Sequence, residues 1–162
     1  MELQNRYLRA DDIRPEQTWE LLAWLEKRGA DEFTFRADGL EGGSTPFCDA
    51  VETVLSQYRL DPVVRDYWSI PVGFPRSGPT PLWRLNAGSR TVLRTVFVPG
   101  LFAYQVGNWE IGCIEDLVVY RSGAIVLGIV SHEREALLSL TEHEHDEVAA
   151  LGIVSRPEPQ WI

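Results

Sequence analysis

The chain has few cysteines and no long apolar run. Only Cys48 and Cys113 occur in 162 residues, and two isolated thiols do not make a disulfide framework, so we expect both to be reduced and buried. The apolar stretch that ends at Val130 is far shorter than the roughly 20 residues that cross a bilayer. The first residues also lack the basic start and apolar run of a secretion signal. These absences predict a cytoplasmic protein that does not enter the membrane.

Positive charge is scarce too. The chain has 15 basic and 24 acidic residues, for a net charge of −9. Lys27 is the single lysine, and this arginine bias is typical of a GC-rich bacterial genome. Nucleic acid is a poor partner, because affinity for DNA or RNA comes mainly from lysine and arginine neutralising phosphates. The charge is uneven: residues 67–109 contain no acid and four arginines.

Helix signals are clear in three places. Pro15 suits a first helical position, and Gly29 provides a stop, which predicts a helix over 15–28. Thr45 before Pro46 predicts a second helix over about 46–59. A Thr-x-x-Glu capping box that starts at Thr141 predicts a last helix over 142–151. Between the first two helices, the alternation of apolar and polar residues predicts a strand over 32–37.

The middle of the chain is less regular. Residues 61–81 contain five prolines and predict a long ordered loop, with a strand around 67–72. Its aromatic content argues against a solvated linker, so 1–162 is interpreted as one domain, and whether 61–81 encloses a pocket stays open. Residues 89–98 fit a strand or a helix, and we favour a helix capped by Ser89.

Short apolar segments separated by turn signals fill the rest of the chain. They cover 101–106, 109–114, 116–121, 124–131 and 135–140. This spacing predicts an antiparallel meander over about 101–140. Because helices come first and strands later, the pattern indicates an α+β fold in which helices 15–28 and 46–59 cover one face of the sheet.

No motif identifies a catalytic or metal site. His132, Glu133, Glu135, His143 and His145 lie close in sequence, but they lack the spacing that brings two ligands to one helical face. We therefore predict no metal and no cofactor. Cys48 near a helix start is interpreted as buried packing, and Ser131 lies outside a nucleophile-elbow motif.

Two groups of residues are candidates for small-ligand binding. Trp83 and Arg84 belong to the arginine-rich middle segment, where forked hydrogen bonds and stacking could hold an anion. The alternative to anion binding is that these arginines pair with acids of the same fold. They are Arg76, Arg84, Arg90 and Arg94. Tyr120 and Arg121 could meet His132 and Glu133 across a hairpin, although the expected register separates them.

The acidic segment 132–147 suggests a partner-binding surface. Glu142, Glu144, Asp146 and Glu147 fall in the predicted last helix and could dock a basic protein, or could be an ordinary solvated face. The sequence does not select one function. We favour a protein-binding module of inhibitor, immunity or regulatory type over the alternative, a small enzyme or an anionic-ligand-binding protein that uses the His132 region and the middle arginines.

Overall fold

The computed structural model describes residues 2–38, 45–63, 80–98, 100–104, 106–108 and 112–157. The predicted strand around 67–72, Arg76 and most of the 61–81 segment lie outside these residues.

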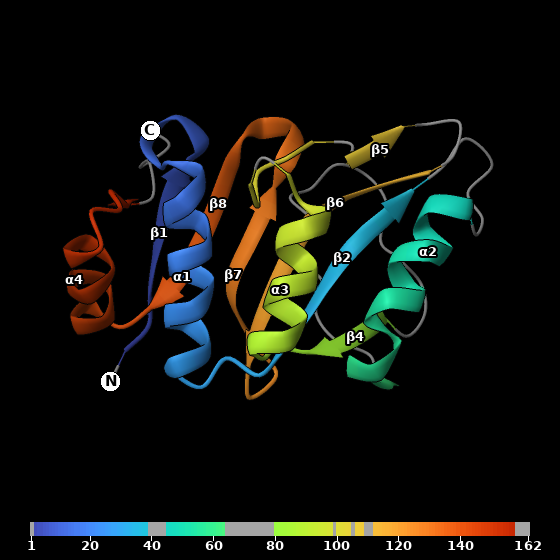
Figure 1. Cartoon of the computed structure of the whole chain (residues 1–162). Coiled ribbons are helices and arrows are strands. Elements are labelled where there is room, and N and C mark those ends of the chain that lie inside the picture. The colour runs from blue at the N-terminus through green and yellow to red at the C-terminus, as the bar shows by residue number, and fades with distance from the viewer. Residues whose placement is uncertain are drawn as a thin grey trace.

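Nine strands form one sheet in the order β3-β4-β2-β6-β7-β8-β1-β9, with β5 paired to β6 (Figure 1). Every pairing of the described strands is antiparallel. The strands are β1 (Gln4–Arg9), β2 (Glu32–Asp38), β3 (Arg59–Val63), β4 (Thr80–Arg84), β5 (Val106–Asn108), β6 (Gly112–Arg121), β7 (Ala124–Val130), β8 (Glu135–Leu140) and β9 (Arg156–Pro157).

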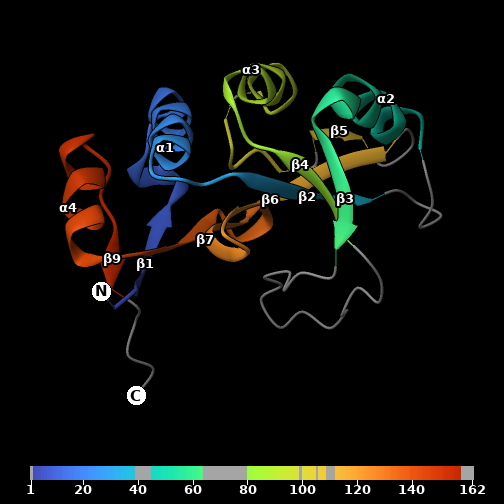
Figure 2. The ribbon, with the colours of Figure 1, turned by 90° about the horizontal axis from the view of Figure 1, so that it is seen from below.

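Four α-helices accompany the sheet: α1 (Pro15–Lys27), α2 (Pro46–Leu55), α3 (Ala87–Val96) and α4 (Glu142–Ala150). Figure 2 shows α1, α3 and α2 side by side over one face of the sheet, with α4 at one end, next to α1. Three 3₁₀ segments, η1 (Ala10–Asp12), η2 (Ser56–Tyr58) and η3 (Ser131–Glu133), connect these elements. The α+β prediction is confirmed, including helices over one face.

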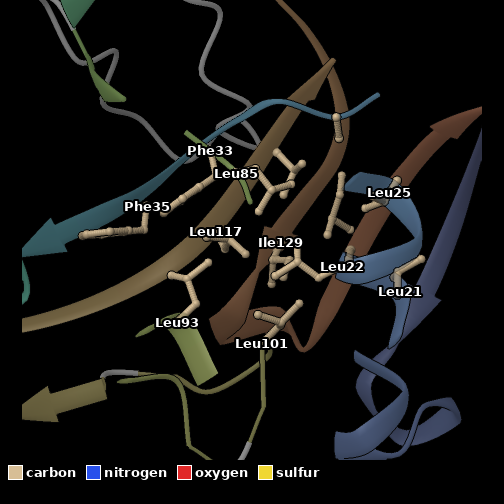
Figure 3. Close-up of a cluster of buried hydrophobic side chains, with 14 of the residues drawn as sticks. Leu21, Leu22, Leu25, Phe33, Phe35, Leu85, Leu93, Leu101, Leu117 and Ile129 are labelled. Atoms are coloured by element: carbon tan, nitrogen blue, oxygen red, sulfur yellow. The ribbon is translucent and has the colours of Figure 1, made fainter. Parts of the chain in front are cut away.

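The main core lies between the sheet and the three helices. Phe33, Phe35, Leu117 and Ile129 point from the sheet toward leucines of α1 and α3 (Figure 3). Each fully buried side chain of this size contributes about 2 kcal/mol of transfer free energy. The opposite face is also covered along β6, because Val118 and Tyr120 are fully buried beside Leu82. Burial on both faces explains the continuous apolar run over residues 117–120 of this strand.

The structure differs from the sequence-based expectation along 101–121. Residues 101–104 form a turn, with the Ala103 N–H bonded to the Gly100 carbonyl at 2.9 Å, and not the predicted strand. From Gly112 onward, the described parts of the expected strands 109–114 and 116–121 form the single strand β6, whose pairing with β2 contains a β-bulge. Thr34 pairs with Val118 but Arg36 pairs with Glu115, so Phe35 faces two residues of β6. The boundary that the sequence predicts between two strands, next to Asp116, is therefore a kink within one strand.

Further differences concern helix ends and early strands. The α3 helix begins earlier than predicted and is capped by Asn86, whose side chain accepts from the Ser89 N–H, while Ser89 itself serves as the third helical residue. The regular part of α2 ends at Leu55, where η2 begins. Strands β1, β3 and β4 were not predicted. Strand β1 lies between β8 and β9, which brings both ends of the described chain to one side of the sheet.

Candidate functional site

A cleft of about 680 Å³ opens at one end of the sheet. Three parts of the chain form it: η1 with the first turn of α1, described residues between Val98 and Gly107, and η3 with Arg134. Strands β1 and β8 bring the first and third segments together, since Arg9 pairs with Glu135. The Ala10 N–H then bonds to the Arg134 carbonyl at 2.8 Å, which fixes the two 3₁₀ turns against each other.

Two reciprocal hydrogen bonds lie beneath the cleft. The Asp116 N–H donates to Ser131 Oγ at 3.0 Å, and the Ser131 N–H donates to Asp116 Oδ1 at 2.7 Å. Ser131, which lines the cleft, is fully buried, and Asp116 is 8% exposed. Because buried backbone donors are costly when unpaired, this pair stabilises the kink of β6 and the start of η3 together.

The kink carries backbone strain. Asp116 has φ 55° and Arg134 has φ 59°, both in the left-handed region that costs most residues about 1–2 kcal/mol. The two residues flank Ser131 in space: Asp116 exchanges hydrogen bonds with it, and the Arg134 N–H bonds to its carbonyl at 3.1 Å. Two of the three described non-glycine residues with positive φ therefore contact Ser131, which lines the cleft.

Two buried carboxylates, those of Glu115 and Asp116, lie at this kink and face the same arginine. Glu115 is 3% exposed, and its Oε1 lies 3.5 Å from Arg36 Nη1, while Asp116 Oδ2 lies 3.9 Å from the same nitrogen. One arginine thus faces two carboxylates that are largely removed from water. This arrangement compensates part of the desolvation cost of the two acids.

The walls of the cleft are mainly apolar, and its rim carries two rings. The Tyr104 and His132 ring centroids are 6.4 Å apart and tilted by 51°. Ile13, Phe102 and Val106 supply further aliphatic and aromatic surface to the lining. Val98 and Tyr104, which are 67% and 50% exposed, are two of the five large exposed hydrophobic residues in the described chain, and both line this cleft.

Arg134 is the charged side chain among the described residues of the cleft lining. Arg134 and His132 both line it, whereas none of the described lining residues is acidic. The acids lie outside: Asp11 Oδ1 is 2.6 Å from Arg134 Nη2, and Glu133 Oε1 is 3.6 Å from His132 Nε2. The cleft lining therefore combines apolar side chains with one guanidinium, whose acidic partner Asp11 lies outside the lining.

The structure places the other predicted ligand residues elsewhere. Trp83 is buried and stacks on Phe35 with centroids 4.6 Å apart, so it is part of the core. Arg84 is exposed at a second hollow, of about 500 Å³, which also contains Glu26, Asp31 and Glu32. Arg90 pairs internally with Glu26 at 2.5 Å.

Tyr120 and Arg121 are not close to His132 and Glu133. Arg121 pairs with Ala124 at the turn of the β6–β7 hairpin, and Ser131 lies seven residues farther along the second strand. At about 3.3 Å per residue this is roughly 23 Å. Tyr120 is fully buried, and Arg121 bonds to Glu144 at 2.5 Å. Of the four residues, His132 alone lines the cleft.

The acidic residues of α4 divide into two pairs. Glu144 is held by Arg121 and by the Thr141 cap, and Glu147 pairs with Arg28. The Arg121 hydrogen bond lowers the pKa of Glu144 to about 2, aided by Thr141, although burial acts in the opposite direction. Glu142 and Asp146 are exposed. Two of the four predicted docking carboxylates are thus engaged inside the fold.

The histidines of α4 have different environments. His143 is exposed, whereas His145 is fully buried, with Nε2 2.9 Å from the Gln4 carbonyl oxygen. Burial lowers the pKa of His145. Within the part of the chain that the structure describes, no three His, Cys, Asp or Glu side chains gather closely enough to hold a metal ion. None of the described helices combines the length and apolar character needed to cross a bilayer.

Comparisons with protein-family models, curated proteins and solved structures gave no match.

Sequence reasoning identified His132 but missed the residues that give its surroundings their shape. Asp116 and Ser131 are fifteen positions apart, and only the strand register brings them together. Arg134 had no local signal for its left-handed backbone. The apolar pattern over 101–106 predicts a strand at Tyr104, although the Pro99-Gly100 dipeptide before it is a turn signal.

Proposed function

We propose that this protein binds a small organic molecule in the cleft formed by η1, Val98–Gly107 and η3. One observation carries the proposal: two strained residues, Asp116 and Arg134, both contact Ser131, which lines the cleft. Backbone strain persists only where its surroundings enforce it, and it is concentrated at functional sites. The volume is also within the range of ligand-binding sites, whose linings combine apolar side chains with a few polar groups.

The hydrogen bonds favour binding over catalysis. A serine nucleophile needs an accessible hydroxyl and a neighbouring base. Ser131 is fully buried, and its hydroxyl oxygen accepts the Asp116 N–H, while the Asp116 carboxylate accepts the Ser131 N–H. These contacts suit a rigid support for the cleft.

The test is a fragment screen by two-dimensional amide NMR on three proteins. In the wild type, binding fragments should shift amide signals of residues 100–107 and 131–134. Ala103→Trp should block these shifts, because the indole fills the cleft that Ala103 lines. Val54→Trp, on exposed α2 surface, is the matched control and should leave them unchanged. Fragments that shift other regions only, or that bind Ala103→Trp equally well, would contradict the proposal.

A second candidate function is the docking of a basic protein partner through α4. It is favoured by Glu142 and Asp146, which lie one helical turn apart and are exposed, while Glu144 and Glu147 are paired internally. Such rim charges act chiefly on the association rate and are screened over roughly 10 Å at 0.1 M salt.

The docking test replaces only the exposed pair. A partner recovered from the native host by the wild type should associate more slowly with Glu142→Lys/Asp146→Lys, and this difference should shrink as salt rises. Glu16→Lys/Glu20→Lys makes the same charge change on exposed positions of α1 and is the control. Equal association rates for the two double variants would exclude α4 as the docking surface.

A further inference from the structure

We infer that the ligand of this cleft is a small organic carboxylate, with its anionic group at Arg134 and its apolar body between Tyr104 and the aliphatic wall. This inference rests on the proposed ligand-binding function and adds the chemical class of the ligand. It follows from the charge pattern of the cleft, from the way Arg134 is held, and from the shape of the apolar part.

The charge pattern is unusual for this protein. Acids outnumber basic residues by 24 to 15 in the whole chain, yet the described lining of the cleft contains Arg134 and His132 and no acid. The second hollow is an internal comparison, since three acids accompany its one arginine, Arg84. Of these two hollows, the cleft beside η3 has the more favourable electrostatic potential for an anion.

Arg134 is held at its backbone and is accessible at its guanidinium. Its carbonyl accepts the Ala10 N–H and its N–H donates to Ser131, so the root of the side chain is fixed. The guanidinium offers five donors, and Asp11 is bonded to Nη2. The Asp11 side chain is 82% exposed. Because such solvated ion pairs contribute little, a bound carboxylate can share or displace this contact.

The rest of the cleft suits an apolar body. The tilted rings of Tyr104 and His132 stand at the rim, and Ile13 and Phe102 form part of the wall. Exposed Val98 and Tyr104 would lose water contact on binding, which favours an aryl or alkyl group over a bare inorganic anion. A body of about six to ten carbons fits a site of this size.

The experiment compares matched probes by NMR titration at neutral pH. Three compounds share one apolar body: 3-phenylpropionate, 3-phenylpropanol and 3-phenylpropylamine, followed by the corresponding hexyl series. The wild type should bind the carboxylates about tenfold more tightly than the alcohols, as expected for one charge-assisted hydrogen-bonded contact at a partly exposed site. The amines should bind most weakly.

Variants then assign the preference to its residues. Arg134→Gln should remove the preference for carboxylate while alcohol affinity stays the same. Arg94→Gln, at an exposed position of α3 outside the cleft lining, removes the same charge and should retain the preference. Asp11→Asn should have the opposite effect on carboxylate affinity. It deletes the exposed carboxylate that competes for Arg134, so carboxylate binding should tighten several-fold.

The outcomes separate the two proposals. Equal binding of alcohols and carboxylates at the cleft, or a carboxylate preference that survives Arg134→Gln, overturns the inference and leaves the ligand-binding function standing. If Arg134→Gln does not fold, unchanged carboxylate affinity in Asp11→Asn overturns the inference instead. If none of the probes shifts the amides of 100–107 or 131–134 at millimolar concentration, both proposals fall.

Discussion

At the scale of single residues, Asp116 links the sheet to the cleft. Its left-handed backbone lets β6 place two residues opposite Phe35, and its carboxylate anchors η3 through the Ser131 N–H. Aspartate and asparagine tolerate this backbone region better than other non-glycine residues, because their short polar side chains bond locally. The identity of the residue therefore follows from both its conformation and its partner.

This double role distinguishes two substitutions of Asp116. Asp116→Ala loses the acceptor for a buried N–H and the tolerance for positive φ, so we expect the free energy of unfolding to fall by about 2–4 kcal/mol. Asp116→Asn retains an Oδ1 acceptor and the tolerated backbone, and should cost less than about 1 kcal/mol. Urea unfolding of the three proteins measures both values. Equal losses in the two variants would mean that the carboxylate charge beside Arg36, and not the hydrogen bond to Ser131, dominates.

At the scale of elements, α4 uses its carboxylates in two ways. Glu144 closes the capping box with Thr141 and also bonds to Arg121 at the turn of the β6–β7 hairpin. Glu147 reaches Arg28 at the end of α1. These contacts join α4 to two separate elements, while Glu142 and Asp146 stay in solvent. A run of acids that looks uniform in the sequence is thus partly structural.

The Glu144 ion pair predicts an acid-sensitive contribution to stability. The native pKa is about 2 against an ordinary value of 4.5. Because the folded-state pKa is depressed, the contribution is complete above about pH 4.5 and is lost as pH falls toward 2. The shift corresponds to an upper limit on the order of 3 kcal/mol. Glu144→Gln keeps a capping-box side chain but removes the charge.

Urea unfolding at several pH values between 5 and 2.5 tests this contribution. The wild type should lose more stability over this range than Glu144→Gln, and Asp146→Asn, which changes an exposed acid of the same helix, should follow the wild type. Parallel pH profiles for wild type and Glu144→Gln would show that the ion pair adds no net stability.

The elements that could be predicted from the sequence are those with local boundary signals. Pro15, Thr45 and Thr141 mark helix starts, and all three helices begin where expected. Strand β1 could not be recognised, because Leu8 is its one fully buried residue, and its place is set by pairing with β8. The cleft could not be recognised from the sequence either. His132 is a visible candidate, but the kink, the Asp116–Ser131 pair and the turn at 101–104 depend on contacts between distant segments.

At the scale of the whole molecule, both ends of the described chain stabilise the same side of the sheet. Strand β1 pairs with β8 and β9, and Gln17 donates to the carbonyls of Leu151 and Gly152. His145 joins α4 to β1 through the Gln4 carbonyl. Because a carbonyl can only accept, His145 Nε2 carries the proton. Its Nδ1 is buried and has no hydrogen-bond partner among the described residues.

This geometry makes the junction of the two ends sensitive to mild acid. Burial lowers the native pKa of His145 below 6.5, and nearby Arg6 acts in the same direction, whereas the Gln4 contact, Glu144 and Asp146 oppose it. Below about pH 6.5 the unfolded chain takes up a proton that the native state resists. Stability should therefore fall as pH drops through 6.5 and level off once the native histidine is protonated.

His145→Gln, which retains an N–H for Gln4 but does not titrate, should lose this dependence between pH 7.5 and 5.5. His143→Gln, at the exposed histidine of the same helix, should retain it. Amide protection factors, which correct the exchange rate for its intrinsic pH dependence, should fall together in α4 and β1 at the lower pH in the wild type, because the buried His145 imidazole lies on α4 and contacts β1. A loss of protection in α4 with unchanged protection in β1 would mean that the helix opens alone and that His145 does not couple the two ends.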